Sequence, residues 1–282
     1  MNSLLKGLIY DGELSYAVMD ITEMVNDAVK IHNLTPLTAA ALGRTLAAST
    51  FMASTLKNEG DRLSVVVAGD GVGGKITVCG NRELCMRGYI DNPSATLPLN
   101  AKGKLDVGGC VGKKGRISVV KSMGLKEPYS GTSPIVSGEI AEDFAAYYAV
   151  SEQQPTAMAL GVKMKDGKCV GAGGVVIQAL PGAKEENLIK AENIVNSLTN
   201  ISTLIETLGA EGVAKKYFNG DYEKYFPKYK CLCNRKAIEN VILSIPKSEA
   251  DDIIKQEGAI KVSCQFCNKE YVFTKDDVEK LF

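Results

Sequence analysis

Two close pairs of cysteines near the C-terminus restrict the possible structures of this chain more than any other motif. Cys231 and Cys233 form a C-x-C pair, and Cys264 and Cys267 form a C-x-x-C pair after the intervening residues 234–263. Four thiolates in two close pairs match the tetrahedral preference of Zn²⁺. The single histidine, His32, lies far away in the sequence, so a Cys₄ site for one Zn²⁺ is expected. An iron–sulfur centre and plain disulfides remain as alternatives.

The segment around these pairs, residues 228–282, is expected to be a small module. A module of about 55 residues is only marginally stable without a bound metal or a disulfide. A structural zinc can contribute roughly 10–16 kcal/mol to its folding. Capping-box patterns predict one helix that begins at Ser248 and ends at Gly258, and another that begins at Thr274. Residues 260–262 and 271–273 are predicted strands on either side of the second pair.

The C-x-C pair permits a chemical switch. Such a pair closes a small strained ring when oxidised, and strained disulfides are labile. Oxidation of the four cysteines to two disulfides would remove every ligand and release the metal. The residues therefore leave two interpretations open, a redox switch and a structural zinc ribbon with a fixed protein or nucleic-acid partner. A catalytic thiol or hydrolase enzyme is a weaker third interpretation.

The charge and composition of the chain exclude some classes of function. The 33 Lys and Arg residues balance 33 Asp and Glu residues, which excludes a strongly basic protein that neutralises phosphate over its whole surface. Residues 228–282 are close to neutral as well, so no nucleic-acid partner is expected. Hydrophobic residues make up 45% of the chain, a value typical of globular proteins.

The expected location is the cytoplasm, with no membrane partner. No run approaches the roughly 18 apolar residues of a membrane span, and the N-terminal segment reaches Lys6 too early for a signal peptide. The remaining cysteines lie in apolar or glycine-rich surroundings and are expected to be reduced and buried, as small hydrophobic side chains; they are Cys79, Cys85, Cys110 and Cys169.

Residues before the module are predicted to be mixed α and β. Apolar spacing predicts helices at 16–33, 36–58 and 138–152, and a long helical stretch over 184–218 that Gly209 interrupts. The main domain boundary is expected near residues 219–227. β-Branched and apolar runs predict strands at 63–68, 75–79, 84–90, 115–121, 156–164 and 169–180.

No enzymatic site stands out. The run from Gly69 to Lys75 fits two phosphate-loop expressions, but Ile76 replaces the hydroxyl residue, and a strand rather than a helix is expected after it. A glycine-rich β-turn is the better interpretation. His32 is expected to lie at a helix C-terminus, where it interacts with the helix dipole. No catalytic residue is assigned, and the chain is expected not to be an enzyme.

Several longer segments resemble the heat shock protein 33 family of redox-regulated bacterial chaperones. The four cysteines resemble that family's redox switch, although Leu232 stands where a polar residue is common. The other similar segments span nearly the whole chain in the same order and are residues 136–143 (Val-Ser-Gly-Glu-Ile-Ala-Glu-Asp), 147–148 (Tyr-Tyr), 151–156 (Ser-Glu-Gln-Gln-Pro-Thr), 172–181 and 264–271.

The resemblance implies an α+β protein in three parts. An N-terminal mixed α/β core, 1–180, would bind clients, a helical linker, 181–227, would act as a metastable sensor, and a Cys₄ zinc module, 228–282, would be the redox switch. The reduced form would hold one Zn²⁺ on the four cysteines and be inactive. Oxidation would form the disulfides Cys231–Cys233 and Cys264–Cys267, release zinc and unfold the linker. The protein would then dimerise and bind unfolding proteins without ATP.

Overall fold

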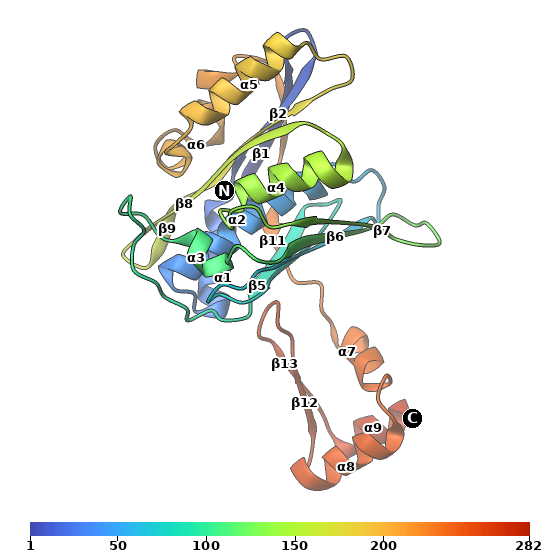
Figure 1. Ribbon diagram of the computed structural model, residues 1–282. Helices are drawn as coiled ribbons and strands as arrows, with labels where there is room; N and C mark the ends of the chain where they lie inside the picture. The colour runs from blue at the N-terminus through green and yellow to red at the C-terminus, as the bar shows by residue number, and fades with distance from the viewer. The chain divides into compact units, whose positions relative to one another are not determined.

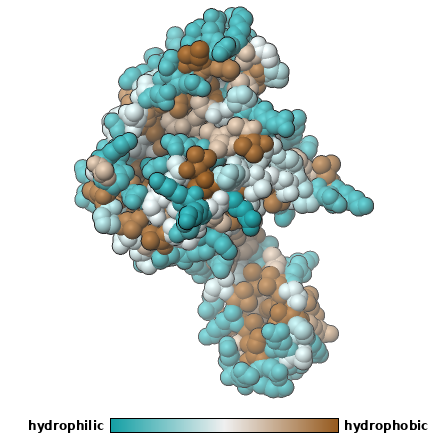
Figure 2. Space-filling model, viewed as in Figure 1, coloured by the Kyte–Doolittle hydropathy of each residue, from teal (hydrophilic) through white to brown (hydrophobic).

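The computed structural model describes all residues from 1 to 282 and has an α+β fold (Figure 1). The chain separates into two compact units, Met1–Tyr229 and Lys230–Phe282. The first unit holds one antiparallel sheet, one mostly antiparallel sheet and six α-helices, and the second holds a hairpin and three helices. None of the helices combines the length and the apolar character that a membrane span requires. Hydrophilic residues cover much of the surface seen in Figure 2, with hydrophobic patches between them.

The first sheet has five strands in the order β10-β1-β2-β9-β8, and every neighbouring pair is antiparallel. Its longest strand, β9, is largely buried because both faces are covered. The strands are β1 (Ser3–Ile9), β2 (Leu14–Asp20), β8 (Thr156–Lys165), β9 (Lys168–Ala179) and β10 (Tyr222–Tyr225).

The second sheet has six strands in the order β11-β5-β4-β3-β6-β7. Only the short β11 runs parallel to its neighbour. Alternation of buried and less buried side chains along β3 and β4 marks a sheet with one face in the core. The strands are β3 (Arg62–Ala68), β4 (Ile76–Asn81), β5 (Cys85–Ile90), β6 (Arg116–Ser122), β7 (Tyr129–Pro134) and β11 (Lys228–Tyr229).

Helix α2 (Pro36–Ala53) is the centre of the main core. Thr35 caps it through its side chain, and nearly every residue from Leu37 to Ala53 is buried. Its Ala, Leu, Ser and Thr side chains make the helix apolar or small on all sides, which suits a helix enclosed by protein. One continuous apolar cluster joins this helix to both sheets. The shorter helices of this unit are α1 (Thr22–His32), α3 (Val107–Val111) and α4 (Ala141–Tyr147).

Helices α5 (Glu185–Ser197) and α6 (Ile201–Tyr217) cover the other face of the first sheet (Figure 1). A second apolar cluster joins Ile205 and Val213 of α6 to sheet residues such as Val18. Tyr16 of β2 stacks on Phe218 with ring centroids 4.3 Å apart. Gly209 has φ 64° and ψ 179°, so α6 is bent at the predicted interruption. The helical stretch expected over 184–218 is also broken between Ser197 and Ile201, a break that was not predicted.

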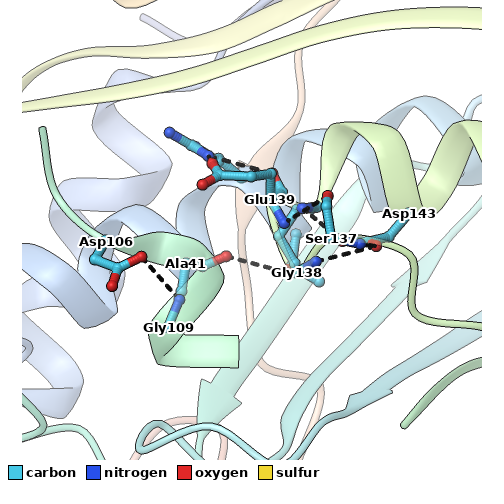
Figure 3. Close-up of polar contacts among 10 residues, drawn as sticks. Ala41, Asp106, Gly109, Ser137, Gly138, Glu139 and Asp143 are labelled. Carbon is cyan, nitrogen blue, oxygen red and sulfur yellow. Dashed lines mark hydrogen bonds and ion pairs between the residues drawn. The ribbon is translucent and has the colours of Figure 1, made fainter. Parts of the chain in front are cut away.

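The turn between β7 and α4 closes around Asp143 (Figure 3). This carboxylate is fully buried and accepts backbone hydrogen bonds from Val136, Ser137 and Gly138 on Oδ1 and from Ile140 on Oδ2, at 2.7–3.2 Å. Asp106 accepts a similar bond from Gly109 at the start of α3. Residues 136–143, which carry part of the family resemblance, thus form a tightly hydrogen-bonded turn.

Several predicted elements differ from the structure. The expected helix over 16–33 begins only at Thr22, because residues 14–20 pair with β1 and β9. The helix expected over 36–58 ends at Ala53, and the one expected over 138–152 begins at Ala141 and becomes a π-helical turn at Tyr148. Strands β1 and β7 and helix α3 were not predicted from the sequence. Tyr222–Tyr225, expected near a boundary, is the edge strand β10.

Other predictions are confirmed. Strands lie at all six predicted places in the first unit. The glycine-rich run after β3 is a turn that leads directly into β4, as expected for a hairpin and not for a phosphate loop. His32 is the last residue of α1, and its Nε2 shares a hydrogen bond with the Tyr229 hydroxyl at 3.1 Å.

The second unit is built around a two-stranded sheet, β12 (Ile260–Ser263) and β13 (Glu270–Phe273). Seven buried apolar residues form its core, from Ile238 of α7 to Val278 of α9. Gly258 ends α8 and Thr274 caps α9, both as predicted, but α8 begins after Pro246 rather than at Ser248. The helices are α7 (Arg235–Ile242), α8 (Lys247–Glu257) and α9 (Lys275–Leu281).

Candidate functional site

The four cysteines of the two pairs come together in the second unit. Cys231 and Cys233 lie in the segment before α7, and Cys264 and Cys267 lie in the turn between β12 and β13. All four sulfur atoms lie within 4.8 Å of one another, and all four side chains are half-buried.

Local hydrogen bonds shape the two cysteine segments. In the hairpin turn, the Cys264 carbonyl accepts the amides of Cys267 and Asn268, and the Cys264 amide donates to the Lys269 carbonyl. Asn268 takes a positive φ of 56°, which this residue type tolerates. On the other segment, the Asn234 side chain accepts the Ala237 amide and starts α7 directly after Cys233. Both segments therefore present their sulfur atoms from short, hydrogen-bonded turns.

The sulfur spacing fits a tetrahedral metal site. Cys231 Sγ lies 3.7 Å from Cys264 Sγ, and Cys233 Sγ lies 3.5 Å from Cys267 Sγ. Zn–S bonds of about 2.3 Å place the sulfur atoms of a tetrahedron about 3.8 Å apart. The donor set is also the one that zinc prefers in structural sites. The four thiols thus have the spacing and chemistry to hold a zinc ion.

The thiols differ in their electrostatic surroundings. Burial raises the pKa of Cys231 and of Cys267. Burial acts in the same direction on Cys233, but hydrogen bonds from Tyr271 and the neighbouring thiols outweigh it and lower its pKa to about 7. The same hydrogen bond to Cys233 raises the pKa of Tyr271 to about 12. The lowered pKa favours the thiolate of Cys233, which is the form that binds a metal.

Arg235 ties the first cysteine segment to the rest of the module. Its guanidinium pairs with Asp277 of α9 at 3.0 Å, donates to the Val272 carbonyl at 3.1 Å and lies 4.3 Å from the centre of the Phe273 ring. These contacts connect the start of α7 to β13 and α9. The two cysteine pairs are therefore held by one continuous structure and not by independent loops.

The remaining cysteines stand apart from this site. Cys85, Cys110 and Cys169 are buried in the first unit, as predicted, and burial raises the pKa of Cys110 to about 11 and of Cys169 to about 12. Cys79 was also predicted to be buried, but it is only half-buried, and its thiol lies 3.7 Å from the Ser64 hydroxyl. Sequence reasoning did not anticipate Tyr271 as a neighbour of the thiols, because no local pattern connects it to Cys233, which precedes it by 38 positions.

Comparison with known proteins agrees with this arrangement. The model of the family described as Hsp33 protein matches residues 2–274. The chain belongs to the Hsp33 family. A 33 kDa chaperonin of Caldanaerobacter subterraneus subsp. tengcongensis is 41% identical over 277 residues, 96% of this chain and 94% of that protein. A 33 kDa chaperonin of Clostridium botulinum, strain Eklund 17B, is 43% identical over 92% of this chain and 90% of that protein.

The structural comparison extends the likeness to the fold. The crystal structure of the 33 kDa chaperonin of Thermotoga maritima, a heat shock protein 33 homologue, superposes with a TM-score of 0.92 at 34% identity, over 99% of this chain and 97% of that one. Membership of the Hsp33 family supports a chaperone role for this chain.

Proposed function

We propose that this Hsp33 family member is a redox-gated holdase, a chaperone that binds unfolding proteins without ATP. In the reduced form, Cys231, Cys233, Cys264 and Cys267 hold one Zn²⁺ and the protein is inactive. Oxidation forms the disulfides Cys231–Cys233 and Cys264–Cys267, releases the zinc and activates the chaperone. The observation that carries this proposal is the gathering of four half-buried thiols within 4.8 Å on a small module.

Because that module is small, its folding would depend strongly on bound zinc. Only seven buried apolar residues form its core. Modules of this size have marginal stability unless a metal or a disulfide stabilises them. A structural zinc contributes roughly 10–16 kcal/mol to folding such a module. Oxidation removes that contribution, because a disulfide sulfur no longer offers a thiolate to the metal. Small chemical changes of this kind drive order–disorder transitions in other switches.

The apolar face of the first sheet supports the role of residues 181–227 as a covering linker. Its side chains, such as Leu5 and Val175, pack in one cluster with Ile205 and Val213 of α6. Unfolding of α5 and α6 would expose this face, and exposed apolar patches are typical binding sites for protein partners. Residues 1–180 would then present the client-binding surface.

The rest of the proposal concerns partners and location. The active form dimerises, since a newly exposed apolar face is also available to a second copy. Its clients are unfolded or partly unfolded proteins in the cytoplasm, and it needs no nucleic acid, membrane or enzymatic step. The balanced charge of the chain, 33 basic against 33 acidic residues, agrees with a partner recognised by apolar surface.

The decisive experiment is light scattering of a chemically unfolded client diluted into buffer. Zinc-loaded reduced protein is compared with the same protein after peroxide treatment under mild heat. We expect only the oxidised protein to suppress aggregation. Equal inactivity of both forms would overturn the proposal and favour a structural zinc ribbon with a fixed partner.

A cysteine double variant is the matched control. Cys231→Ser with Cys233→Ser removes two of the four ligands and the first disulfide. We expect this variant to bind zinc poorly and to lose the peroxide dependence of its chaperone activity. A double variant that responds to peroxide as the wild-type protein does would contradict the proposed switch.

A further inference from the structure

The hydroxyl of Tyr271 points at the thiol cluster. It donates a hydrogen bond to Cys233 Sγ at an O–S distance of 3.2 Å. Tyr271 lies on β13, immediately after the C-x-x-C turn, whereas Cys233 belongs to the C-x-C segment. The contact therefore links the strand that follows one cysteine pair to a sulfur of the other pair.

The position of this hydroxyl is well defined. Tyr271 is 6% exposed and belongs to the module core. Its backbone pairs with Val262 across the hairpin, and the Lys269 ammonium lies 5.0 Å from its ring centre. Burial of the ring and pairing of the Tyr271 backbone in the hairpin fix the position from which the hydroxyl reaches Cys233.

The charge of the site gives this hydrogen bond a function. Four thiolates around Zn²⁺ carry a net charge of −2, in a partly buried setting. A donor aimed at a thiolate stabilises that charge, and hydrogen bonds from the second layer of residues tune metal affinity in protein sites generally. The same donor withdraws electron density from the sulfur, which makes that sulfur a weaker nucleophile toward an oxidant.

We propose that Tyr271 is a positioning residue of the redox switch. Its hydroxyl holds Cys233 in its ligand position, strengthens zinc binding and slows oxidation of the Cys231–Cys233 pair. This inference rests on the proposed function, because it concerns the rate at which the same site opens. In this way one hydroxyl group sets the amount of peroxide that the first pair withstands.

The step that Tyr271 retards is the oxidation of two thiols by hydrogen peroxide. The Cys233 thiolate attacks one peroxide oxygen, the O–O bond breaks, and the sulfur becomes a sulfenic acid while hydroxide leaves and is protonated to water. The Cys231 thiolate then attacks the Cys233 sulfur, the S–S bond forms, and the departing hydroxide becomes a second water. Two thiols and one peroxide thus give one disulfide and two waters.

Tyr271→Phe tests the proposal because it removes only the hydroxyl. We expect zinc affinity, measured by competition with a chromogenic chelator, to fall about tenfold. Under limiting peroxide we also expect zinc release and loss of alkylatable thiols to proceed several-fold faster. In the cobalt-substituted protein, the thiolate-to-cobalt charge-transfer band should shift.

Val278→Ala is the matched control. Val278 belongs to the same module core but lies on α9, so its truncation loosens the module without touching a thiol. Wild-type rates and affinity in Tyr271→Phe would overturn the proposal, as would an identical acceleration in Val278→Ala with no shift of the cobalt band in Tyr271→Phe. These readouts follow metal and thiols, so they are separable from failure of the aggregation assay.

Discussion

The buried carboxylate of Asp143 accepts hydrogen bonds from four backbone amides, those of Val136, Ser137, Gly138 and Ile140. One of them belongs to Ile140, whose φ of 71° is unusual for a β-branched residue. Such conformations cost about 1–3 kcal/mol and persist only when the surroundings enforce them. The Asp143 carboxylate supplies that enforcement, because it accepts the Ile140 amide together with the three others.

We expect Asp143→Asn to lower the free energy of unfolding by about 3 kcal/mol, because one carboxylate oxygen is replaced by a group that cannot accept a hydrogen bond. Urea unfolding followed by far-UV circular dichroism measures the change. Glu142→Gln is the control, since Glu142 is exposed in the same helical turn, and it should change stability by less than about 0.5 kcal/mol. Equal stability of the two variants would contradict the role of Asp143.

Helix α6 is bent at Gly209, in a region of backbone space that essentially only glycine occupies. The bend divides the helix into a part that includes Ile205 and a part that includes Val213, and both parts contact the first sheet. No atom lies within 4 Å of the place where a Cβ would be added. The glycine is therefore needed for its backbone conformation and not for space.

Gly209→Ala should consequently destabilise α6 by about 1–3 kcal/mol, the cost of this conformation for a residue with a side chain. In the proposed mechanism a weaker linker helix also lowers the amount of peroxide needed for activation. Amide hydrogen exchange over residues 201–217 checks the first effect and light scattering checks the second. Lys215→Ala, an exposed position on the same helix, is the control and should leave exchange unchanged.

The chain as a whole consists of two units with very different cores. Met1–Tyr229 contains two extensive apolar clusters, whereas Lys230–Phe282 contains one of seven buried residues. A metal that stabilises only the smaller unit makes the stability of that unit depend on zinc concentration. The larger unit has two extensive apolar clusters, and the cluster of possible metal ligands lies in the smaller unit, so we expect the stability of the larger unit not to depend on zinc.

Removal of zinc by a strong chelator under reducing conditions should therefore unfold the second unit alone. We expect hydrogen-exchange protection to disappear over 230–282 and to persist in β2, β3 and α2. Addition of excess Zn²⁺ should restore it. Retained protection over 230–282 in the chelated protein would show that zinc is not required for folding of the module.

Local patterns were good predictors wherever a few neighbouring residues define the structure. Thr274 caps α9 as the sequence indicates, and Gly258 ends α8. Periodicity failed over 16–33, where apolar residues at helical spacing also suit a buried strand. Tyr16 to Asp20 form that strand because β1 and β9 offer backbone partners on both sides, and such pairing overrides local preference.

The cysteine spacing was enough to predict that the four thiols gather in one place, where they could hold a metal ion. Contacts between residues far apart in the chain could not be predicted, because only the tertiary structure brings those residues together. Tyr271 reaches Cys233 only because the hairpin of β12 and β13 turns its ring toward the other cysteine segment. Likewise β10 joins the first sheet only through its pairing with β1, more than 200 residues earlier. Helix caps and closely spaced ligands depend on neighbouring residues, so the sequence alone determines them. Contacts between distant segments depend on burial and strand pairing, which exist only in the complete fold.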